Sequence, residues 1–312
     1  SGGGARGAAH VGVLKVLEEM RVPIDAIAGT SMGAVVGGLY ASGLSAEEID
    51  ATLRAVNWEE LLGDRPPRDD LALRRKEEDR NFVVRLPLGL HGGEFRLPKG
   101  LVQGQRLNEL LRKLTLPVAT VHSFDALPTR FRAIATDLES GERVVIASGD
   151  LTTAMRASLS VPGVFVPVER EGRLLVDGGL ADNLPVDVAR AMGVDVLIVV
   201  DAGFPLLERD QLTTVPIITN QMIAILVRRN SEVQRASVAG ADVLIDPALG
   251  NASSFDFRHF AHSIDAGATA ARASAVRIAR FAVGEPQYEA WLAARGQARD
   301  DASPLIDFVR VA

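Results

Sequence analysis

The sequence predicts a three-layer α/β/α domain in which helices cover both faces of a mainly parallel sheet. Short apolar segments with strand patterns alternate with helical patterns along most of the chain, which is typical of this class. Residues 196–200 (VLIVV) are apolar throughout, as expected for a strand that is buried on both faces. Hydrophobic residues make up 47% of the chain, enough for a full core, and no linker divides it. We therefore expect one domain over residues 1–300.

The first elements follow from periodicity and from residues that interrupt it. Apolar residues recur at helical spacing over residues 8–21, and Pro23 follows, so a helix is expected to end there. Residues 24–28 (IDAIA) are short and mostly apolar, which predicts a buried strand. A glycine-containing segment interrupts this strand, and small residues resume a helix over residues 34–41. The order strand, sharp turn, helix is thus predicted near the start of the chain.

Local signals define the remaining elements. Ser45 and Glu48 form a capping-box pattern that starts a helix reaching to about residue 56, and Asp150 is positioned as another helix cap. The densely charged residues 64–80 mix both signs and predict a solvated surface segment. Further strands are expected at residues 82–86, 94–97, 131–136, 143–146, 174–176 and 243–245, and further helices at residues 105–114, 151–158 and 185–192.

Composition excludes several classes of protein. The net charge of −6 and the lack of a clustered basic segment argue against a nucleic-acid partner. No apolar run reaches the roughly 18 residues of a membrane-spanning helix. The absence of cysteine excludes disulfides, thiolate metal sites and cysteine nucleophiles. No metal site and no cofactor are expected.

Residues 29–33 (GTSMG) match the pattern G-x-S-x-G. In this pattern the serine occupies a turn so tight that the flanking residues, Gly29 and Gly33 here, have no room for side chains. The match lies where a predicted strand ends and a predicted helix begins, which is the context that the pattern requires. Ser31 is therefore the candidate nucleophile, and a purely structural turn is the alternative.

Residues 2–7 (GGGARG) precede the first helix. Consecutive glycines allow successive backbone N–H groups to point into one cavity, so Gly2, Gly3 and Gly4 are candidate oxyanion-hole donors. The same letters also fit the dinucleotide pattern G-x-G-x-x-G, but Asp25 lies at the beginning of the next strand rather than at its end, where a ribose-binding acid belongs. Arg6 is expected either to meet a phosphate or to pair with a surface carboxylate.

A serine nucleophile requires a base, and Asp177 is the best candidate. It stands where the apolar strand 174–176 ends, and Gly178 and Gly179 after it permit close approach, so strand pairing can bring it to Ser31. Burial would raise its pKa and make it a better base. The alternative is a Ser-Asp-His triad using His259 or His262, which follow Asp177 in the order found in α/β-hydrolases. The other histidines, His10, His91 and His122, lie in no motif.

Taken in order, GGGARG at residues 2–7, GTSMG at 29–33 and DGG at 177–179 resemble the patatin-like phospholipase family. Residues 158–165 (SLSVPGVF) are similar to a further segment of that family, and Asn183 and Pro185 follow the DGG as in its bacterial members. The resemblance implies a lipid acyl hydrolase with a serine–aspartate dyad, Ser31 as nucleophile and Asp177 as base. It also implies that the Gly2, Gly3 and Gly4 amides form the oxyanion hole, with Arg6, Gly7, Gly29, Gly33, Gly178 and Gly179 supporting the motifs.

The resemblance has further implications for the whole protein. Residues 220–234 and 249–257 are similar to bacterial patatin domains that are fused to a POTRA module and an outer-membrane barrel, in a type V autotransporter-like arrangement. Residues 301–312 would then be a linker and the start of the POTRA module. The protein would be exported to the bacterial outer membrane or secreted, with a cytoplasmic location as the alternative.

These observations predict a phospholipase A type of enzyme that cleaves glycerophospholipid esters through a covalent acyl-enzyme. Its partner would be a phospholipid or a membrane surface. The competing hypotheses are a triad esterase and a non-catalytic module that binds phospholipid or another anion through Arg6 and the glycine amides. The small-residue segment 266–282 is expected either to pack inward or to form a homodimer face.

Overall fold

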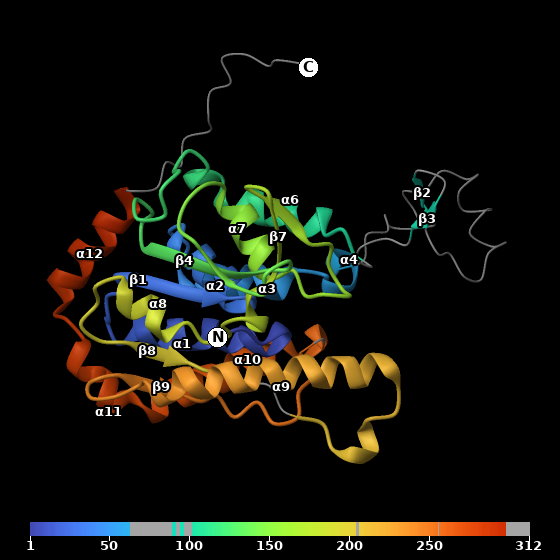
Figure 1. Ribbon diagram of the computed structural model, residues 1–312. Coiled ribbons are helices and arrows are strands. Elements are labelled where there is room, and N and C mark those ends of the chain that lie inside the picture. Colours follow the sequence, from blue (N-terminus) through green and yellow to red (C-terminus); the bar gives the residue numbers. More distant parts are fainter. Residues whose placement is uncertain (63–88, 92–93, 97–101, 204–205, 255, 298–312) are drawn as a thin grey trace, which may run out of the picture.

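A computed structural model describes residues 1–62, 89–91, 94–96, 102–203, 206–254 and 256–297 (Figure 1). The charged segment predicted at residues 64–80, the strand predicted at 82–86 and the linker predicted at 301–312 lie outside the described residues.

The central feature is a mixed sheet built around one long strand, β4 (Arg130–Asp137). β1 (Ala26–Thr30) pairs with it in parallel, whereas β5 (Arg143–Ile146) and β7 (Arg173–Asp177) pair with it antiparallel. β6 (Val168–Arg170) extends the sheet beyond β7. Because β5 lies opposite residues of β4 that also pair with β1 or with β7, β1 and β7 must share the other edge of β4.

This arrangement places the carboxyl ends of β1 and β7 next to each other. β1 runs along β4 until Thr30 lies opposite Ile134, and β7 runs in the reverse direction until Asp177 lies opposite Ala135. The two strands therefore end at neighbouring positions of the same edge. The residue that follows Thr30 and the last residue of β7 are brought together by strand pairing alone.

The expectation of a mainly parallel sheet is wrong. Parallel pairing is found between β1 and β4 and between β8 (Ile198–Val200) and β9 (Val243–Ile245), while the remaining pairs of named strands in the described residues are antiparallel. The physical reason is connection length. β6 and β7 are joined by a tight turn at Glu171 and Gly172, both with positive φ, and such short turns reverse the chain, whereas parallel pairs need a long crossover.

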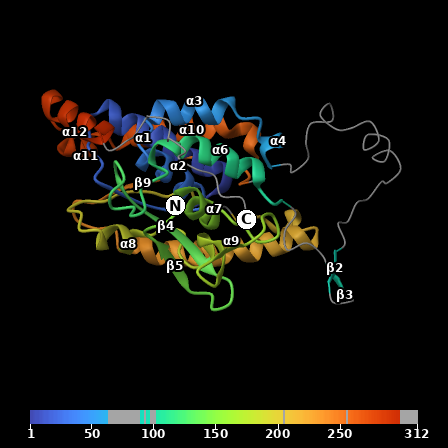
Figure 2. The ribbon, with the colours of Figure 1, turned by 90° about the horizontal axis from the view of Figure 1, so that it is seen from above.

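Helices cover both faces of the sheet, as predicted. α8 (Val186–Ala191) and α9 (Val215–Ala236) lie on one side, and α1 (Ala9–Glu19), α2 (Met32–Ala41) and α10 (Phe260–Ala273) lie on the other, as Figure 2 shows. The three-layer α/β/α architecture inferred from the sequence is thus confirmed.

The other elements are short or peripheral. The predicted caps are present: Ser45 and Glu48 form a capping box, and the Asp150 carboxylate accepts the Thr153 amide. The short or peripheral helices and strands are η1 (Gly4–Ala8), α3 (Ala46–Ala55), α4 (Trp58–Leu62), β2 (Gly89–His91), β3 (Glu94–Arg96), α6 (Gln105–Thr115), η3 (Leu116–Val118), α7 (Leu151–Ser158), η4 (Gly178–Leu180), η5 (Arg209–Gln211), η6 (Phe257–His259), α11 (Ala275–Ile278), η7 (Ala279–Phe281) and α12 (Glu285–Gln297).

The helices α1 and α10 pack backbone to backbone. A Cβ on Gly12 would lie 1.9 Å from the Ile264 carbonyl oxygen, and one on Gly267 would lie 2.0 Å from the Ala9 carbonyl oxygen. Only glycine permits this approach. The first part of the segment 266–282 therefore packs inward, which was one of the two outcomes expected for it.

Candidate active site

Ser31 occupies a strained turn between β1 and α2. Its φ of 54° and ψ of −123° are unusual for a residue with a side chain. Two glycines make the turn feasible: a Cβ on Gly29 would lie 2.4 Å from the Gly33 carbonyl oxygen, and one on Gly33 would lie 2.3 Å from the Ser1 carbonyl oxygen. Residues 29–33 thus form the strand–turn–helix that the sequence pattern requires.

The Ser31 hydroxyl donates a hydrogen bond to Asp177. The distance between Ser31 Oγ and Asp177 Oδ2 is 2.6 Å, and both side chains are buried. The other carboxylate oxygen, Oδ1, accepts the Gly179 amide at 2.8 Å, so the carboxylate is held at both ends. The two residues predicted to meet are brought together by the shared edge of β4.

Burial raises the pKa of Asp177 to about 6. Desolvation of the carboxylate is the largest cause, and the hydrogen bonds from Ser31 and Gly179 oppose it by stabilising the charged form. A carboxylate with this pKa is a stronger base than a free aspartate and is still ionised at neutral pH. The site therefore has the electrostatics of a general base.

Two residues of one segment, Ser158 and Ser160, anchor the backbones of both partners. The Ser31 amide donates to Ser158 Oγ at 2.8 Å, and this hydroxyl in turn donates to the Ile134 carbonyl. The Asp177 amide donates to the Ser160 carbonyl at 2.9 Å. The sequence motif S-x-S carried the resemblance to the family, but no role could be assigned to it before the structure showed what these serines contact.

The glycine-rich segment lies against Ser31. Its predicted role as the oxyanion hole needs one correction, which concerns Gly2. A Cβ on Gly2 would come within 3.1 Å of Ser31 Cβ. However, the Gly2 amide already donates to the Asn183 carbonyl at 3.1 Å and to Asn183 Oδ1 at 3.2 Å, so it is not available as an oxyanion donor. Within the described residues, no acceptor is found for the amides of Gly3 and Gly4. These two remain the candidate donors.

Among the described residues, Arg6 does not pair with a surface carboxylate, which was one of the two roles expected for it. Its side chain is 6% exposed, and its guanidinium donates to carbonyl groups of two loops rather than to a carboxylate. Because the carbonyls are its partners and burial lowers its pKa, this arginine is a structural clamp that fixes the glycine-rich segment. The acceptors are the carbonyl oxygens of Ala202, Gly203, Leu249, Gly250 and Ala252.

The supporting glycines allow close packing around the site. A Cβ on Gly7 would lie 2.6 Å from Met32 Cβ, so η1 packs directly on the start of α2. A Cβ on Gly178 would lie 2.2 Å from the Ile134 carbonyl oxygen, which keeps the turn after Asp177 pressed against β4. The start of α2 adds its positive dipole end near Ser31.

The structure gives no support to a histidine partner. None of the hydrogen bonds that Ser31 and Asp177 make in the described part of the chain involves a histidine. His10 is buried in α1, its Nε2 atom lies 2.7 Å from the Ser1 carbonyl oxygen, and burial lowers its pKa to about 3. His262 lies on α10, and the side chains of His91 and His259 are outside the description.

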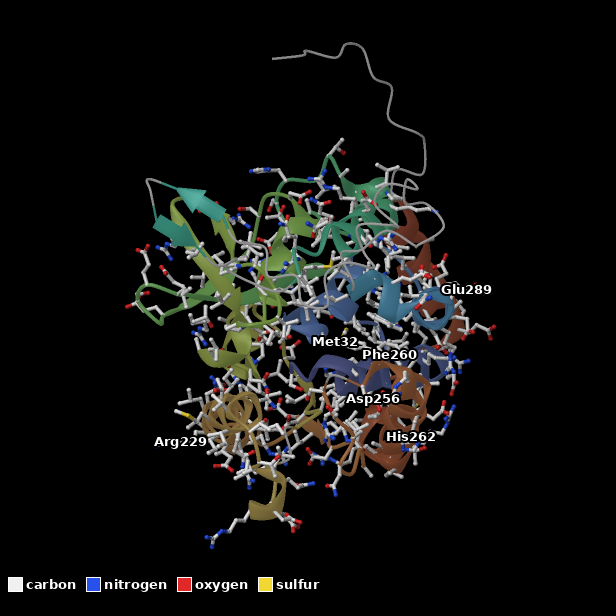
Figure 3. All side chains as sticks on the ribbon, turned by 90° about the vertical axis from the view of Figure 1, so that its right-hand side faces the viewer. Met32, Arg229, Asp256, Phe260, His262 and Glu289 are labelled. Carbon is white, nitrogen blue, oxygen red and sulfur yellow. The ribbon has the colours of Figure 1, made fainter. Side chains whose placement is uncertain are left out.

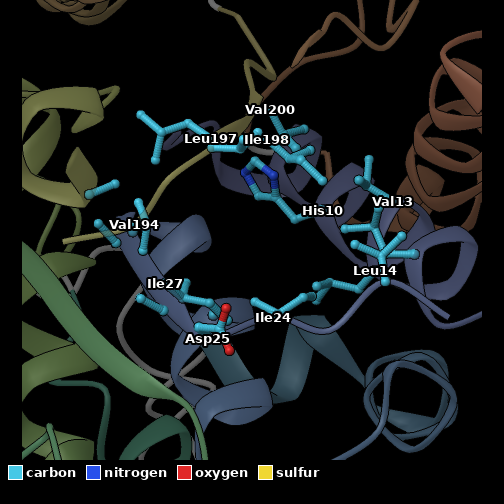
Figure 4. A pocket seen from close by; sticks show the side chains of 18 of the residues that line it. His10, Val13, Leu14, Ile24, Asp25, Ile27, Val194, Leu197, Ile198 and Val200 are labelled. Atoms are coloured by element: carbon cyan, nitrogen blue, oxygen red, sulfur yellow. The ribbon is translucent and has the colours of Figure 1, made fainter. Parts of the chain in front are cut away.

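A cavity of about 400 Å³ lies between β1 and β8 (Figure 4). Its walls are mostly apolar side chains of α1, β1 and β8, among which Figure 4 shows Val13, Ile27 and Ile198. Ser31 and Asp177 are not among the lining residues, but Gly29 and Gly33 are, so the cavity adjoins the Ser31 turn without containing the two reactive side chains. Across residues 1–62, 102–203 and the later described ranges, no acidic and histidine cluster fit for a metal ion is present, and no helix has the length and hydropathy needed to cross a membrane.

Comparisons with known proteins support the patatin-like part of the resemblance. An uncharacterised NTE family protein of Mycobacterium tuberculosis (strain ATCC 25618 / H37Rv) is 35% identical over 198 residues, covering 64% of this chain and 46% of that protein. Patatin-like phospholipase domain-containing protein 7 of Rattus norvegicus is 33% identical over 204 residues, covering 65% of this chain and 13% of that protein. The chain thus spans less than half of the length of these relatives.

A solved structure and a family model complete the comparison. VipD from Legionella pneumophila superposes with a TM-score of 0.48 at 15% sequence identity, covering 95% of this chain and 73% of that one. The model of the patatin-like phospholipase family matches residues 1–190, which include the glycine-rich segment, the Ser31 turn and the Asp177 turn. The chain belongs to the patatin-like phospholipase family.

Proposed function

We propose that this chain is a serine lipid acyl hydrolase of the phospholipase A type, which cleaves the carboxylic esters of glycerophospholipids through a Ser31–Asp177 dyad. The observation that carries the proposal is the 2.6 Å hydrogen bond between the Ser31 hydroxyl and the buried Asp177 carboxylate. Family membership supports ester hydrolysis in lipids, and the dyad geometry supports the mechanism.

In the first half-reaction, Ser31 Oγ attacks the ester carbonyl carbon while its proton passes to Asp177 Oδ2. The carbonyl π electrons move to oxygen, and the free amides of Gly3 and Gly4 stabilise the resulting oxyanion. Collapse of this intermediate expels the lysophospholipid alkoxide, which takes the proton from Asp177. The acyl group is left as an ester of Ser31.

In the second half-reaction, water replaces the alcohol. The water oxygen attacks the carbonyl carbon of the acyl-enzyme while Asp177 takes a proton from the water. Asp177 then returns that proton to Ser31 Oγ when the fatty acid leaves. The hydrogen bond from the Gly179 amide to Oδ1 leaves Oδ2 as the proton-transferring oxygen. The two half-reactions together consume one water molecule for each ester bond that is cleaved and regenerate the free enzyme.

The test is product analysis by mass spectrometry with a phospholipid whose two acyl chains differ, beside labelling with a fluorophosphonate probe. We expect release of fatty acid and lysophospholipid together with a stoichiometric label on Ser31. Ser31→Ala should lose both signals. Ser42→Ala is the matched control, because Ser42 is a buried serine just after α2 whose hydroxyl donates to the Leu39 carbonyl, away from Ser31 and Asp177.

The same assay separates the competing hypotheses. A non-catalytic anion-binding module would show neither product nor label in the unmodified protein. A Ser-Asp-His triad would lose turnover in His259→Ala or in His262→Ala, whereas the dyad predicts that both variants remain active. Full activity in Ser31→Ala would overturn the proposal altogether.

We further propose that this chain is part of a longer, exported protein that also carries a POTRA module and an outer-membrane barrel. The similarity of residues 220–234 and 249–257 to such fusions supports this location. Fractionation of cells that express the full-length protein tests it: we expect the chain with the outer membrane or in the medium. Recovery with the cytoplasmic fraction alone would overturn this part of the proposal and leave the chemistry unaffected.

A further inference from the structure

The long helix α9 has one face that is buried against the described part of the chain and a second, apolar face that this part leaves exposed. Its inner face carries Ala224, Val227 and Ser231, all buried. A surface helix of a globular protein normally has one apolar side and one polar side. The exposed apolar side of α9 departs from this pattern, because no packing within the described residues accounts for it.

The outer face carries an apolar stripe, which Arg229 interrupts near its end. Its members follow one another at intervals of mostly three or four residues, which places them on one side of a helix, over a length of about 27 Å at about 1.5 Å per residue. A contiguous exposed apolar patch of this kind marks an interaction site. The stripe consists of Val215 (77% exposed), Ile218 (46%), Met222 (63%), Ile225 (41%), Leu226 (53%) and Val233 (72%).

The charge within this stripe is positive. Arg229 falls between Leu226 and Val233 on the same side, is exposed, and forms no ion pair with the described part of the chain. Figure 3 shows Arg229 at the outer margin of the molecule. The neighbouring Arg228 is paired with Glu232 at 2.9 Å on the margin of the stripe. A cation inside an apolar stripe, in a chain of net charge −6, indicates a partner that offers apolar surface and anions together.

The inner face of the same helix supports the candidate active site. Asn230 Nδ2 donates to the Gly179 carbonyl at 2.8 Å, in the turn that follows Asp177. Ser231 Oγ accepts from Asn183 Nδ2 at 3.1 Å, and Asn183 holds the Gly2 amide. One face of α9 thus positions both sides of the site, while the opposite face is left exposed by residues 1–62, 102–203 and the later described ranges.

We propose that the outer face of α9 docks on the surface of anionic phospholipid aggregates. This inference rests on the proposed function, because a lipid hydrolase must meet its substrate at such a surface. The six apolar side chains would enter the acyl region of the interface, and Arg229 would extend its guanidinium back to the phosphate layer. A second copy of the chain fits less well: it would have to bury Arg229, and the stripe contains no carboxylate to pair with it.

The test measures binding to vesicles separately from turnover. In the Ser31→Ala background, which leaves the lipid intact, cosedimentation with phosphatidylglycerol vesicles is compared with cosedimentation with phosphatidylcholine vesicles. We expect Met222→Gln/Leu226→Gln to weaken binding to the anionic vesicles by about tenfold or more, because two large apolar side chains no longer leave water. Val276→Gln, a 91% exposed valine on α11, is the matched control and should bind unchanged.

Two further readouts complete the design. With Ser31 intact, the double variant should lose at least about ten times more activity on vesicles than on a short-chain soluble ester, because only the former requires docking. Arg229→Gln should reduce the preference for phosphatidylglycerol. If the unmodified protein hydrolyses neither the vesicles nor the soluble ester, the proposed function is refuted. The vesicle-binding measurement would still test the docking face, because it does not depend on turnover.

Three results would overturn the docking proposal. One is vesicle binding by the double variant equal to that of the Val276→Gln control. Another is equal binding of the Ser31→Ala protein to phosphatidylglycerol and phosphatidylcholine vesicles, together with no effect of Arg229→Gln on binding to either. The third is a lipid-free dimer, measured by sedimentation velocity, that the double variant converts to monomer without weakening vesicle binding, since the stripe would then belong to a second copy.

Discussion

Replacing Asp177 by asparagine should stabilise the protein while abolishing its chemistry. The carboxylate has an ordinary pKa of 3.8 and is raised to about 6 by burial. A raised folded-state pKa means that folding favours the protonated form, so stability present at low pH is lost as pH rises from about 4 through about 6. Ionised Asp177 therefore destabilises the fold at neutral pH.

The size of this effect follows from the pKa. At about 1.36 kcal/mol per pKa unit, the change corresponds to about 3 kcal/mol above pH 7. Asparagine has nearly the same shape and carries no charge, and its carbonyl oxygen can still accept the Gly179 amide. We expect Asp177→Asn to gain up to about 3 kcal/mol in free energy of unfolding at pH 7.5 and almost nothing at pH 3.5, while turnover falls by about 10²–10⁴-fold.

The assay is urea denaturation of the unmodified protein and of the variant at both pH values, with ester hydrolysis measured beside it. The difference between the two pH values is the informative quantity, because packing effects of the substitution cancel in it. A stability difference between the variant and the unmodified protein that is the same at both pH values would show that the carboxylate is not a desolvated charge.

Three other predictions follow from the same geometry. Below pH 6, kcat/KM on a soluble ester should fall about tenfold per pH unit as Asp177 becomes protonated, and a profile that is flat down to pH 5 would contradict this. Ser158→Ala should cost about 1–3 kcal/mol of stability and lower kcat, because it removes the acceptor of the nucleophile's buried amide; unchanged melting and kcat would argue against that anchor. Gly267→Val should destabilise by more than about 4 kcal/mol or prevent folding, because its Cβ would meet the Ala9 carbonyl, whereas Gly296→Ala, with no neighbour within 4 Å, should melt as the unmodified protein does.

Much of the fold could be predicted because its signals are local. The caps at Ser45 and Asp150 and the break at Pro23 each depend on a few neighbouring residues, and the helices and strands near them are found close to their predicted positions. The direction of strand pairing was predicted less well. A turn such as Glu171-Gly172 reverses the chain, and the apolar pattern of the flanking strands does not reveal which neighbour each will choose.

The candidate site likewise contains features that local sequence predicts and features that depend on contacts between distant residues. The turn at Ser31 is encoded by glycines within two residues of it, so the pattern alone located it. The occupation of the Gly2 amide depends on Asn183, which is distant in the sequence, and no local pattern indicates that contact. The partners of Arg6 could not be predicted for the same reason, because its acceptors are backbone carbonyls that become neighbours only in the folded chain.

By itself, the sequence determined the alternation of helices and strands, the strained turn that presents Ser31, and the family to which the chain belongs, since each of these depends on short-range stereochemistry or on motif order. Tertiary structure alone decided that β1 and β7 end on the same edge of β4, so that a hydroxyl and a carboxylate share one hydrogen bond. It also decided which side of α9 is left facing water. Contacts of this kind depend on how distant segments pair and pack, and the free energy that selects them exists only in the assembled molecule.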